Sequence, residues 1–127
     1  MKNKKPIIIA HRGASAYAPE NTMAAFQKAV ELSADGIEFD VKCSKDGELV
    51  IIHDQSLERT TNGHGRVIET NLQDLRNLDA GSSFSSEYAG EKIPILSEVL
   101  EEFSKSLIIN IELTNYSSIH DGLAKKA

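Results

Sequence analysis

The sequence predicts an α/β fold built around a parallel sheet. Short apolar runs rich in β-branched residues alternate along the chain with segments whose apolar residues recur at helical spacing. The polar residues suited to chemistry fall where the apolar runs end, and the carboxyl ends of parallel strands meet at one edge of a sheet. With 127 residues, of which 40% are hydrophobic and 26% charged, the chain has the size and composition of one soluble globular domain.

The first strand is expected over residues 6–10, a continuous β-branched run typical of a strand buried on both faces. The run ends abruptly in the triplet HRG at 11–13, where two bases precede a glycine. A helix is expected over residues 23–33, because its apolar residues recur at helical spacing and Asn21 or Thr22 can cap its start.

A second strand is expected over residues 37–41, where Glu38 and Asp40 alternate with apolar residues and therefore share one face. A turn signal follows, and then the apolar run at 49–53. The connection is too short for a parallel crossover, so the two strands are expected to form an antiparallel hairpin. A turn centred between residues 46 and 47 would place Asp40 near His53.

The remaining chain continues the alternation. Residues 54–90 are polar and loop-like, with one short helical candidate at 71–78, and are interpreted as an insertion or lid over a site. An amphipathic helix is expected over 95–103, a strand over 107–113, and the start of a further helix at 120–127.

The convergence of polar residues on one edge of the sheet is the arrangement expected of a (β/α)8 barrel, which takes about 250 residues. The chain is therefore expected to hold only the N-terminal portion of such a barrel, about three βα units. The residues at the expected strand ends are His11, Arg12, Glu38, Asp40 and Glu112.

These side chains suit one kind of chemistry. Carboxylates of Glu38, Asp40 and Glu112 favour a hard cation such as Ca²⁺ or Mg²⁺ over Zn²⁺. A single alternating carboxylate is ordinarily a solvated residue, but a central parallel strand has no solvated face.

The basic residues complete the set. His11 and His53 can exchange protons near neutral pH, and the guanidinium of Arg12 matches phosphate oxygens. A divalent cation, a phosphate-matched cation and two proton carriers together favour hydrolysis of a phosphodiester.

Composition limits the alternatives. The net charge of −5, from 19 acidic and 14 basic residues, argues against nucleic acid as a partner. The single cysteine, Cys43, cannot form an intramolecular disulfide and fits a reducing compartment. The apolar run at 7–10 is too short for a signal peptide, and no window approaches a membrane span. A cytoplasmic protein without stable membrane insertion is therefore expected.

Four ordered motifs resemble one known family: HRGASAYAPENT at 11–22, GIEFDVKCSKDGELVIIHDQSLERTTNGHG at 36–65, IPILSEVL at 93–100 and INIEL at 109–113. Together they closely resemble the glycerophosphodiester phosphodiesterase family of TIM-barrel enzymes, which are similar to the phosphatidylinositol-specific phospholipases C. The resemblance covers nearly the whole chain, so residues 1–127 are interpreted as the N-terminal part of one such domain, with the family's insertion at about 42–93.

The resemblance implies metal-dependent hydrolysis of small glycerophosphodiesters to an alcohol and sn-glycerol 3-phosphate, in phospholipid catabolism. It further implies attack by the neighbouring glycerol hydroxyl, giving a cyclic phosphate that water opens. Carried over by motif, the roles are acid and base for His11 and His53, phosphate ligand for Arg12, and ligands of Ca²⁺ or Mg²⁺ for Glu38, Asp40 and Glu112.

One departure stands out: the family commonly reads Glu-x-Lys where this chain has Glu112-Leu113-Thr114. Weaker charge compensation at the phosphate, or a cation from elsewhere, is expected. Two alternatives stay open: a truncated, non-catalytic half-barrel that self-associates through its exposed edges, and a related phosphodiesterase acting on phosphoinositides or sphingolipids.

Overall fold

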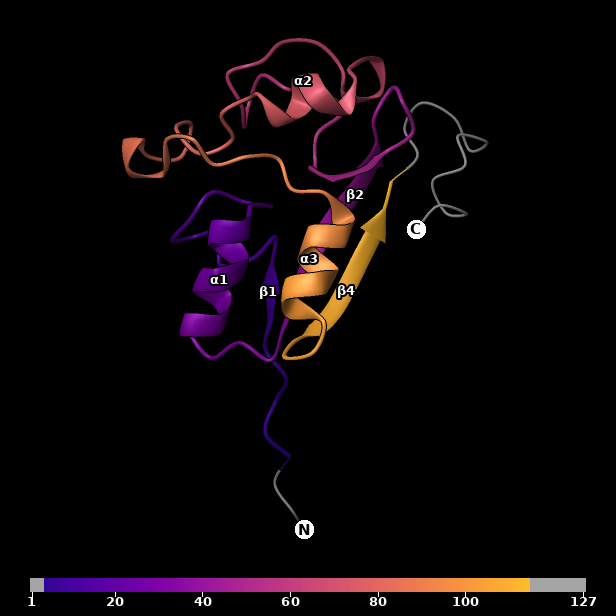
Figure 1. Ribbon diagram of the computed structural model, residues 1–127. Coiled ribbons are helices and arrows are strands. Elements are labelled where there is room, and N and C mark those ends of the chain that lie inside the picture. The colour runs from indigo at the N-terminus through magenta and orange to yellow at the C-terminus, as the bar shows by residue number, and fades with distance from the viewer. Residues whose placement is uncertain (1–3, 115–127) are drawn as a thin grey trace.

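The computed structural model describes residues 4–114 of the chain (Figure 1). Four strands and three α-helices follow in the order β1, α1, β2, β3, α2, α3, β4. Two short 3-10 helices, Val67–Glu69 and Ser86–Tyr88, flank α2. The bounds are β1 Ile9–His11, α1 Met23–Glu31, β2 Gly36–Cys43, β3 Leu49–Ile51, α2 Leu72–Arg76, α3 Leu96–Phe103 and β4 Ile108–Leu113.

Strand β2 is the centre of the sheet. Strand β4 pairs with it in parallel along one edge, from Gly36 opposite Ile108 to Val41 opposite Leu113. Along the other edge β2 pairs first with β1, in parallel, and then with β3, antiparallel. The α/β class, the parallel sheet and the antiparallel hairpin are therefore confirmed.

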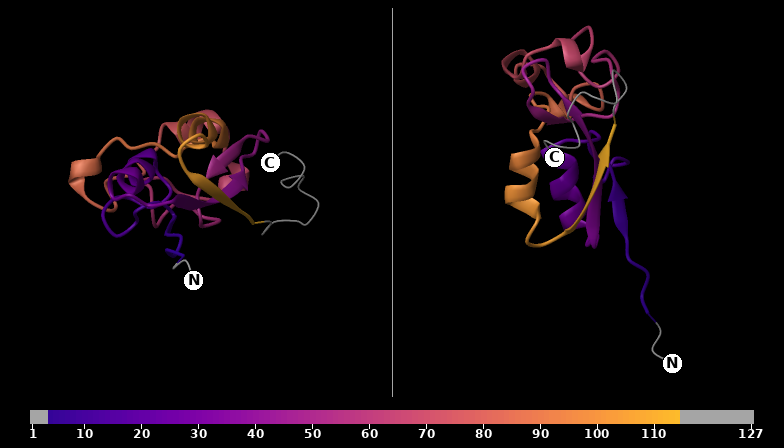
Figure 2. Two further views of the ribbon diagram at one scale, coloured as in Figure 1. Left: turned by 90° about the horizontal axis from the view of Figure 1, so that it is seen from below. Right: turned by 90° about the vertical axis from the view of Figure 1, so that its right-hand side faces the viewer.

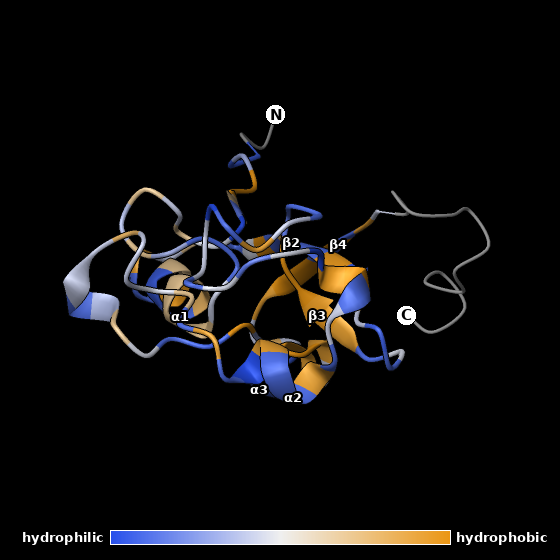
Figure 3. Cartoon of the chain, turned by 90° about the horizontal axis from the view of Figure 1, so that it is seen from above, coloured by the Kyte–Doolittle hydropathy of each residue, from blue (hydrophilic) through white to orange (hydrophobic). Residues whose placement is uncertain are grey.

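Helices α1 and α3 cover one face of this sheet, as the side view in Figure 2 shows. Every second residue of β2 points into that layer, where Phe39 lies 5.6 Å from Phe26 of α1 between ring centroids. Phe26 in turn contacts Phe103 of α3 in an edge-to-face geometry at 6.0 Å. In Figure 3 hydrophobic residues concentrate on the strands, while several of the surrounding loops are hydrophilic. Because strand residues alternate, Glu38 and Asp40 occupy the other face of β2.

Helix α1 is close to its predicted bounds but ends earlier. Thr22 caps its start, since the Thr22 hydroxyl accepts a hydrogen bond of 3.2 Å from the backbone amide of Ala25. Asn21 takes no part in this cap, and its amide bonds elsewhere. The helix closes at Glu31, two residues before Ser33 adopts a left-handed φ of 62°.

Strand β1 differs from the prediction. It covers Ile9–His11 rather than residues 6–10, and none of its three residues is fully buried. Ile7 and Ile8, which precede it, are 67% and 56% exposed. The physical reason is that no described element packs over Ile7 and Ile8.

The hairpin register also differs from the prediction. Cys43 pairs with Leu49 and Val41 with Ile51, so the turn centres on Asp46 and Ile52, not His53, lies opposite Asp40. The cause is the odd-numbered loop at 44–48, which the Ser44 hydroxyl closes by accepting from the Glu48 amide at 2.9 Å.

The segment between β3 and α3 lies beyond the carboxyl ends of the parallel strands (Figure 1). Helix α2 confirms the short helical candidate, and α3 and β4 begin one residue later than predicted. The segment packs around its own apolar cluster, which includes Leu57, Val67, Leu75 and Ile93. Within residues 4–114, no helix has the length and apolarity needed to cross a membrane. The helix predicted at 120–127 lies outside the described residues.

Candidate functional site

Three carboxylates from β2 and β4 meet on one face of the sheet, with Glu38 and Asp40 inside β2 rather than at its carboxyl end. Asp40 and Glu112 are register partners on the two strands, and Glu38 precedes them on the same face of β2. One oxygen of each of the three lies within 4.8 Å of the others. Asp40 is fully buried and Glu38 is 9% exposed, whereas Glu112 is exposed. The clustering predicted from strand alternation is thus present.

The cluster keeps features that a bound cation would relieve, although Arg12 lies 3.5 Å from Asp40. Burial and the neighbouring Asp40 carboxylate raise the pKa of Glu38 above its ordinary value. Glu38 Oε1 and Asp40 Oδ1 are buried and have no hydrogen-bond partner among the described residues. Oxygen ligands at this spacing fit Ca²⁺ or Mg²⁺, and this donor set does not distinguish the two ions.

The loop between β1 and α1 supports the two buried carboxylates. The Arg12 backbone amide donates to Glu38 Oε2 at 3.2 Å. The Nε atom of the Arg12 side chain lies 3.5 Å from Asp40 Oδ2. The Asn21 side-chain amide donates to the same Asp40 oxygen at 3.0 Å. Arg12 and Asn21 both adopt left-handed φ values, of 58° and 56°, a conformation that is costly for residues other than glycine.

The two histidines lie at or just after the ends of β1 and β3, which both pair with β2. His11 ends β1, is 66% exposed at its side chain, and places Nε2 at 3.5 Å from Glu38 Oε2. His53 follows Ile52, whose amide donates to the Asp40 carbonyl at 3.1 Å. His53 Nδ1 lies 2.9 Å from Asp54 Oδ1.

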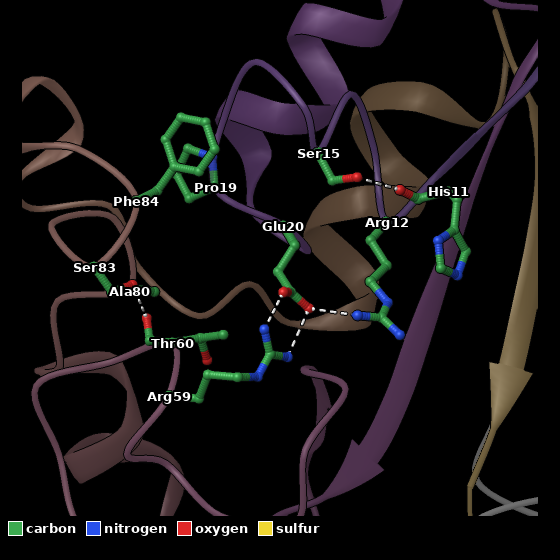
Figure 4. A pocket seen from close by; sticks show the side chains of 10 residues that line it. All are labelled: His11, Arg12, Ser15, Pro19, Glu20, Arg59, Thr60, Ala80, Ser83 and Phe84. Carbon is green, nitrogen blue, oxygen red and sulfur yellow. Dashed lines mark hydrogen bonds and ion pairs between the residues drawn. The ribbon is translucent and has the colours of Figure 1, made fainter.

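A cavity of about 380 Å³ opens beside His11 and Arg12 (Figure 4). His11 lines it from the end of β1, and Arg12 and Glu20 line it from the loop before α1. The segment after β3 contributes Arg59 and Phe84 to the facing wall. The cavity therefore offers a small molecule both a guanidinium and an imidazole.

Lys42 supplies a cation near Thr114, the position where the family commonly has a lysine. Lys42 is 5% exposed and shares its face of β2 with Glu38 and Asp40, and its Nζ donates to Thr114 Oγ1 at 2.8 Å. Burial lowers the pKa of Lys42, while the carboxylates of Asp40, Asp54 and Glu112 oppose that shift. A cation is thus supplied from β2 to the position after β4 where the family commonly has its lysine.

Gly13, the last residue of the HRG triplet, packs closely against α1. Its φ is +77°, and an added Cβ would lie 2.7–2.9 Å from atoms of Ala25 in α1. Glycine is therefore required for close packing of this loop on the helix.

Sequence reasoning missed four residues that support the site: Glu20, Asn21, Asp54 and Arg59. Each contacts a predicted site residue directly or through one carboxylate. The available signal was their placement within the recognised motifs, since Glu20 and Asn21 lie in the first motif and Asp54 directly follows His53.

Comparison with known proteins decides the family. Residues 11–124 match the model of the glycerophosphoryl diester phosphodiesterase family. The chain belongs to this family. A glycerophosphodiester phosphodiesterase of Caldanaerobacter subterraneus is 49% identical over 123 residues, which are 96% of this chain and 51% of that protein. A second, from Bacillus subtilis, is 41% identical over 94% of this chain and 43% of that protein.

Solved structures with a similar fold agree with this assignment. The glycerophosphodiester phosphodiesterase of Agrobacterium tumefaciens has a TM-score of 0.84 and 43% identity, covering 86% of this chain and 47% of that one. An Oleispira antarctica phosphodiesterase, solved in complex with the product sn-glycerol-3-phosphate, has a TM-score of 0.83 and 45% identity over 86% of this chain and 44% of that one. The chain thus spans about half the length of these relatives.

Proposed function

We propose that the chain forms the N-terminal part, with an insertion at about 42–93, of a (β/α)8-barrel phosphodiesterase. In this proposal it hydrolyses glycerophosphodiesters to an alcohol and sn-glycerol 3-phosphate, as a step in phospholipid catabolism. The observation that carries the proposal is the cluster of Glu38, Asp40 and Glu112, with two buried oxygens unpaired among the described residues, beside Arg12 and His11. A product of this kind is bound in the Oleispira relative.

The three carboxylates would hold one divalent cation, Ca²⁺ or Mg²⁺. A bound cation would stabilise the negative charge that builds on the phosphoryl oxygens. Arg12 lines the cavity, and its planar guanidinium would bind the same phosphoryl oxygens. Besides the cation and Arg12, Lys42 would add a third positive charge, since its Nζ is hydrogen-bonded to Thr114.

The histidines move the protons. In the first step the glycerol hydroxyl next to the ester attacks phosphorus and gives its proton to one imidazole, while the other imidazole protonates the departing alcohol oxygen. In the second step water opens the cyclic phosphate and the two imidazoles return to their starting states. His53 suits either role because Asp54 bonds to its Nδ1, which leaves Nε2 for the proton transfer.

An assay of sn-glycero-3-phosphocholine hydrolysis, in which released sn-glycerol 3-phosphate is measured, tests this proposal. Activity is expected with Ca²⁺ or Mg²⁺, absent with chelator, and lost in His11→Ala and Glu38→Gln. His64→Ala, which alters an exposed loop histidine, is the matched control and keeps full activity. Full hydrolysis by His11→Ala or in excess chelator would contradict the assigned roles.

A non-catalytic half-barrel is the second candidate, and one observation favours it. Strands β1 and β4 each pair only with β2 within the described chain, and Ile8 and Ile108 beside those edges are 56% and 50% exposed. Such edges favour association with another copy of the chain. Sedimentation of the purified chain separates the candidates, since a self-associated species without hydrolysis supports the second.

A further inference from the structure

Arg59 joins two loops that are far apart in the sequence. Its Nε and Nη2 donate to the two oxygens of Asp54, at 2.8 Å and 3.0 Å. Its Nη1 and Nη2 donate to the two oxygens of Glu20, at 2.5 Å and 3.1 Å. Glu20 lies 39 residues earlier, in the loop before α1. One guanidinium thus makes two bidentate contacts, and Figure 4 shows the Glu20 contact on the cavity wall.

Each of the two carboxylates is shared with a proposed site residue. Asp54 Oδ1 lies 2.9 Å from His53 Nδ1, and Glu20 Oε2 accepts from Arg12 Nη1 at 3.1 Å. A continuous line of contacts therefore runs from His53 through Asp54, Arg59 and Glu20 to Arg12.

Geometry and charge both make this line stronger than an ordinary surface ion pair. Single exposed pairs contribute little to stability, and the Arg59 side chain is 49% exposed. Here, however, two bidentate pairs share one donor group, which fixes orientation as well as distance. The hydrogen bonds from Arg59 hold the pKa of Asp54 well below its usual range, so the carboxylate stays charged at neutral pH.

We propose that Arg59 is a positioning residue that fixes the His53 imidazole and the Arg12 guanidinium relative to each other. Asp54, held by Arg59, accepts a hydrogen bond from the Nδ1–H group and so selects the tautomer in which Nε2 is free to accept a proton. Glu20, held from the same guanidinium, fixes the position of Arg12. The roles of His53 and Arg12, at the two ends of this line of contacts, rest on the proposed function. The tautomer of His53 and the geometry of the contacts do not.

The test is ¹⁵N NMR of the His53 imidazole in the full chain, combined with hydrolysis kinetics. The wild-type chain is expected to carry the neutral-state proton mainly on Nδ1. Arg59→Met shifts the proton toward Nε2 and lowers kcat by about tenfold to a hundredfold. Arg59→Lys keeps the charge but cannot make two bidentate contacts. Its tautomer ratio and its kcat should therefore fall between those of the wild-type chain and Arg59→Met. If Arg59→Met fails to fold, the lysine variant decides.

Two variants serve as controls. Arg66→Met removes an exposed arginine from the same segment, and Tyr88→Phe removes another tie between these loops, the hydrogen bond of 3.1 Å from its hydroxyl to the Tyr17 carbonyl. Both keep the wild-type tautomer. A wild-type tautomer or a wild-type kcat in folded Arg59 variants overturns the inference. If the wild-type chain does not hydrolyse the diester, the proposed function fails, and the tautomer still decides whether Arg59 positions His53.

Discussion

The side-chain amide of Asn21 donates a hydrogen bond of 3.0 Å to Asp40, the fully buried carboxylate of the cluster. Removing this donor should loosen the orientation of a ligand oxygen. Asn21→Gly is compatible with the left-handed backbone and deletes the side chain that carries the amide, so calcium affinity is expected to fall about tenfold to a hundredfold by calorimetry. Ser33→Gly, at an exposed left-handed position after α1, is the control and should bind calcium like the wild-type chain.

Lys42 is expected to act on substrate rather than on metal. Lys42→Met removes a buried cation beside Asp40 and Glu112, so KM for glycerophosphocholine should rise about tenfold, while calcium affinity stays equal or increases. Adding Thr114→Lys to this variant returns a cation to the same position and should lower KM again. Unchanged KM in Lys42→Met, or no recovery in the double variant, would contradict this role.

The stability of the metal-free chain should depend on pH through Glu38. Burial first, and Asp40 second, raise the folded-state pKa of Glu38 above 4.5, the ordinary value. Protonated Glu38 therefore contributes to the free energy of unfolding below about pH 4.5, and this contribution is lost as the pH rises through the folded-state pKa. In chelator, Glu38→Gln should gain stability relative to wild type as pH increases from 4 to 7, measured by thermal unfolding. With calcium at pH 7, the wild-type chain should instead be more stable than Glu38→Gln. A stability difference between the two proteins that stays constant from pH 4 to 7 in chelator would contradict this prediction.

Gly13 gives a prediction about packing alone. Gly13→Ala combines a left-handed φ with contacts of 2.7–2.9 Å to Ala25, so it should lower the free energy of unfolding by about 3 kcal/mol. Gly65→Ala is matched in its positive φ of +97° but has open space around the added Cβ, and should cost about 1 kcal/mol. Urea unfolding measures both, and equal losses would show that backbone conformation, not the contact with Ala25, decides.

The sequence predicts the fold class and the carboxylate cluster because both follow from periodicity. Alternation along β2 puts Glu38 and Asp40 on one face, and parallel pairing brings Glu112 beside Asp40. The hairpin register was missed because one residue in the turn shifts every pair, and sequence alone does not give the loop's odd length.

The residues that hold the site could not be predicted in the same way. Arg59 and Glu20 are 39 residues apart in two irregular loops, where no periodicity relates one position to another. The Asn21 contact was hidden by a competing local interpretation, because asparagine before a helix is ordinarily a cap. The exposure of β1 was missed since an apolar run does not reveal what packs against it.

Calorimetric titration of the chain with CaCl₂ tests the central claim most directly, because it measures the cation site without requiring hydrolysis. One Ca²⁺ per chain is expected, with binding lost in Asp40→Asn and retained in Glu101→Gln, which removes the same charge from the exposed surface of α3. Binding in Asp40→Asn equal to that of the wild-type chain would contradict a cation site formed by Glu38, Asp40 and Glu112.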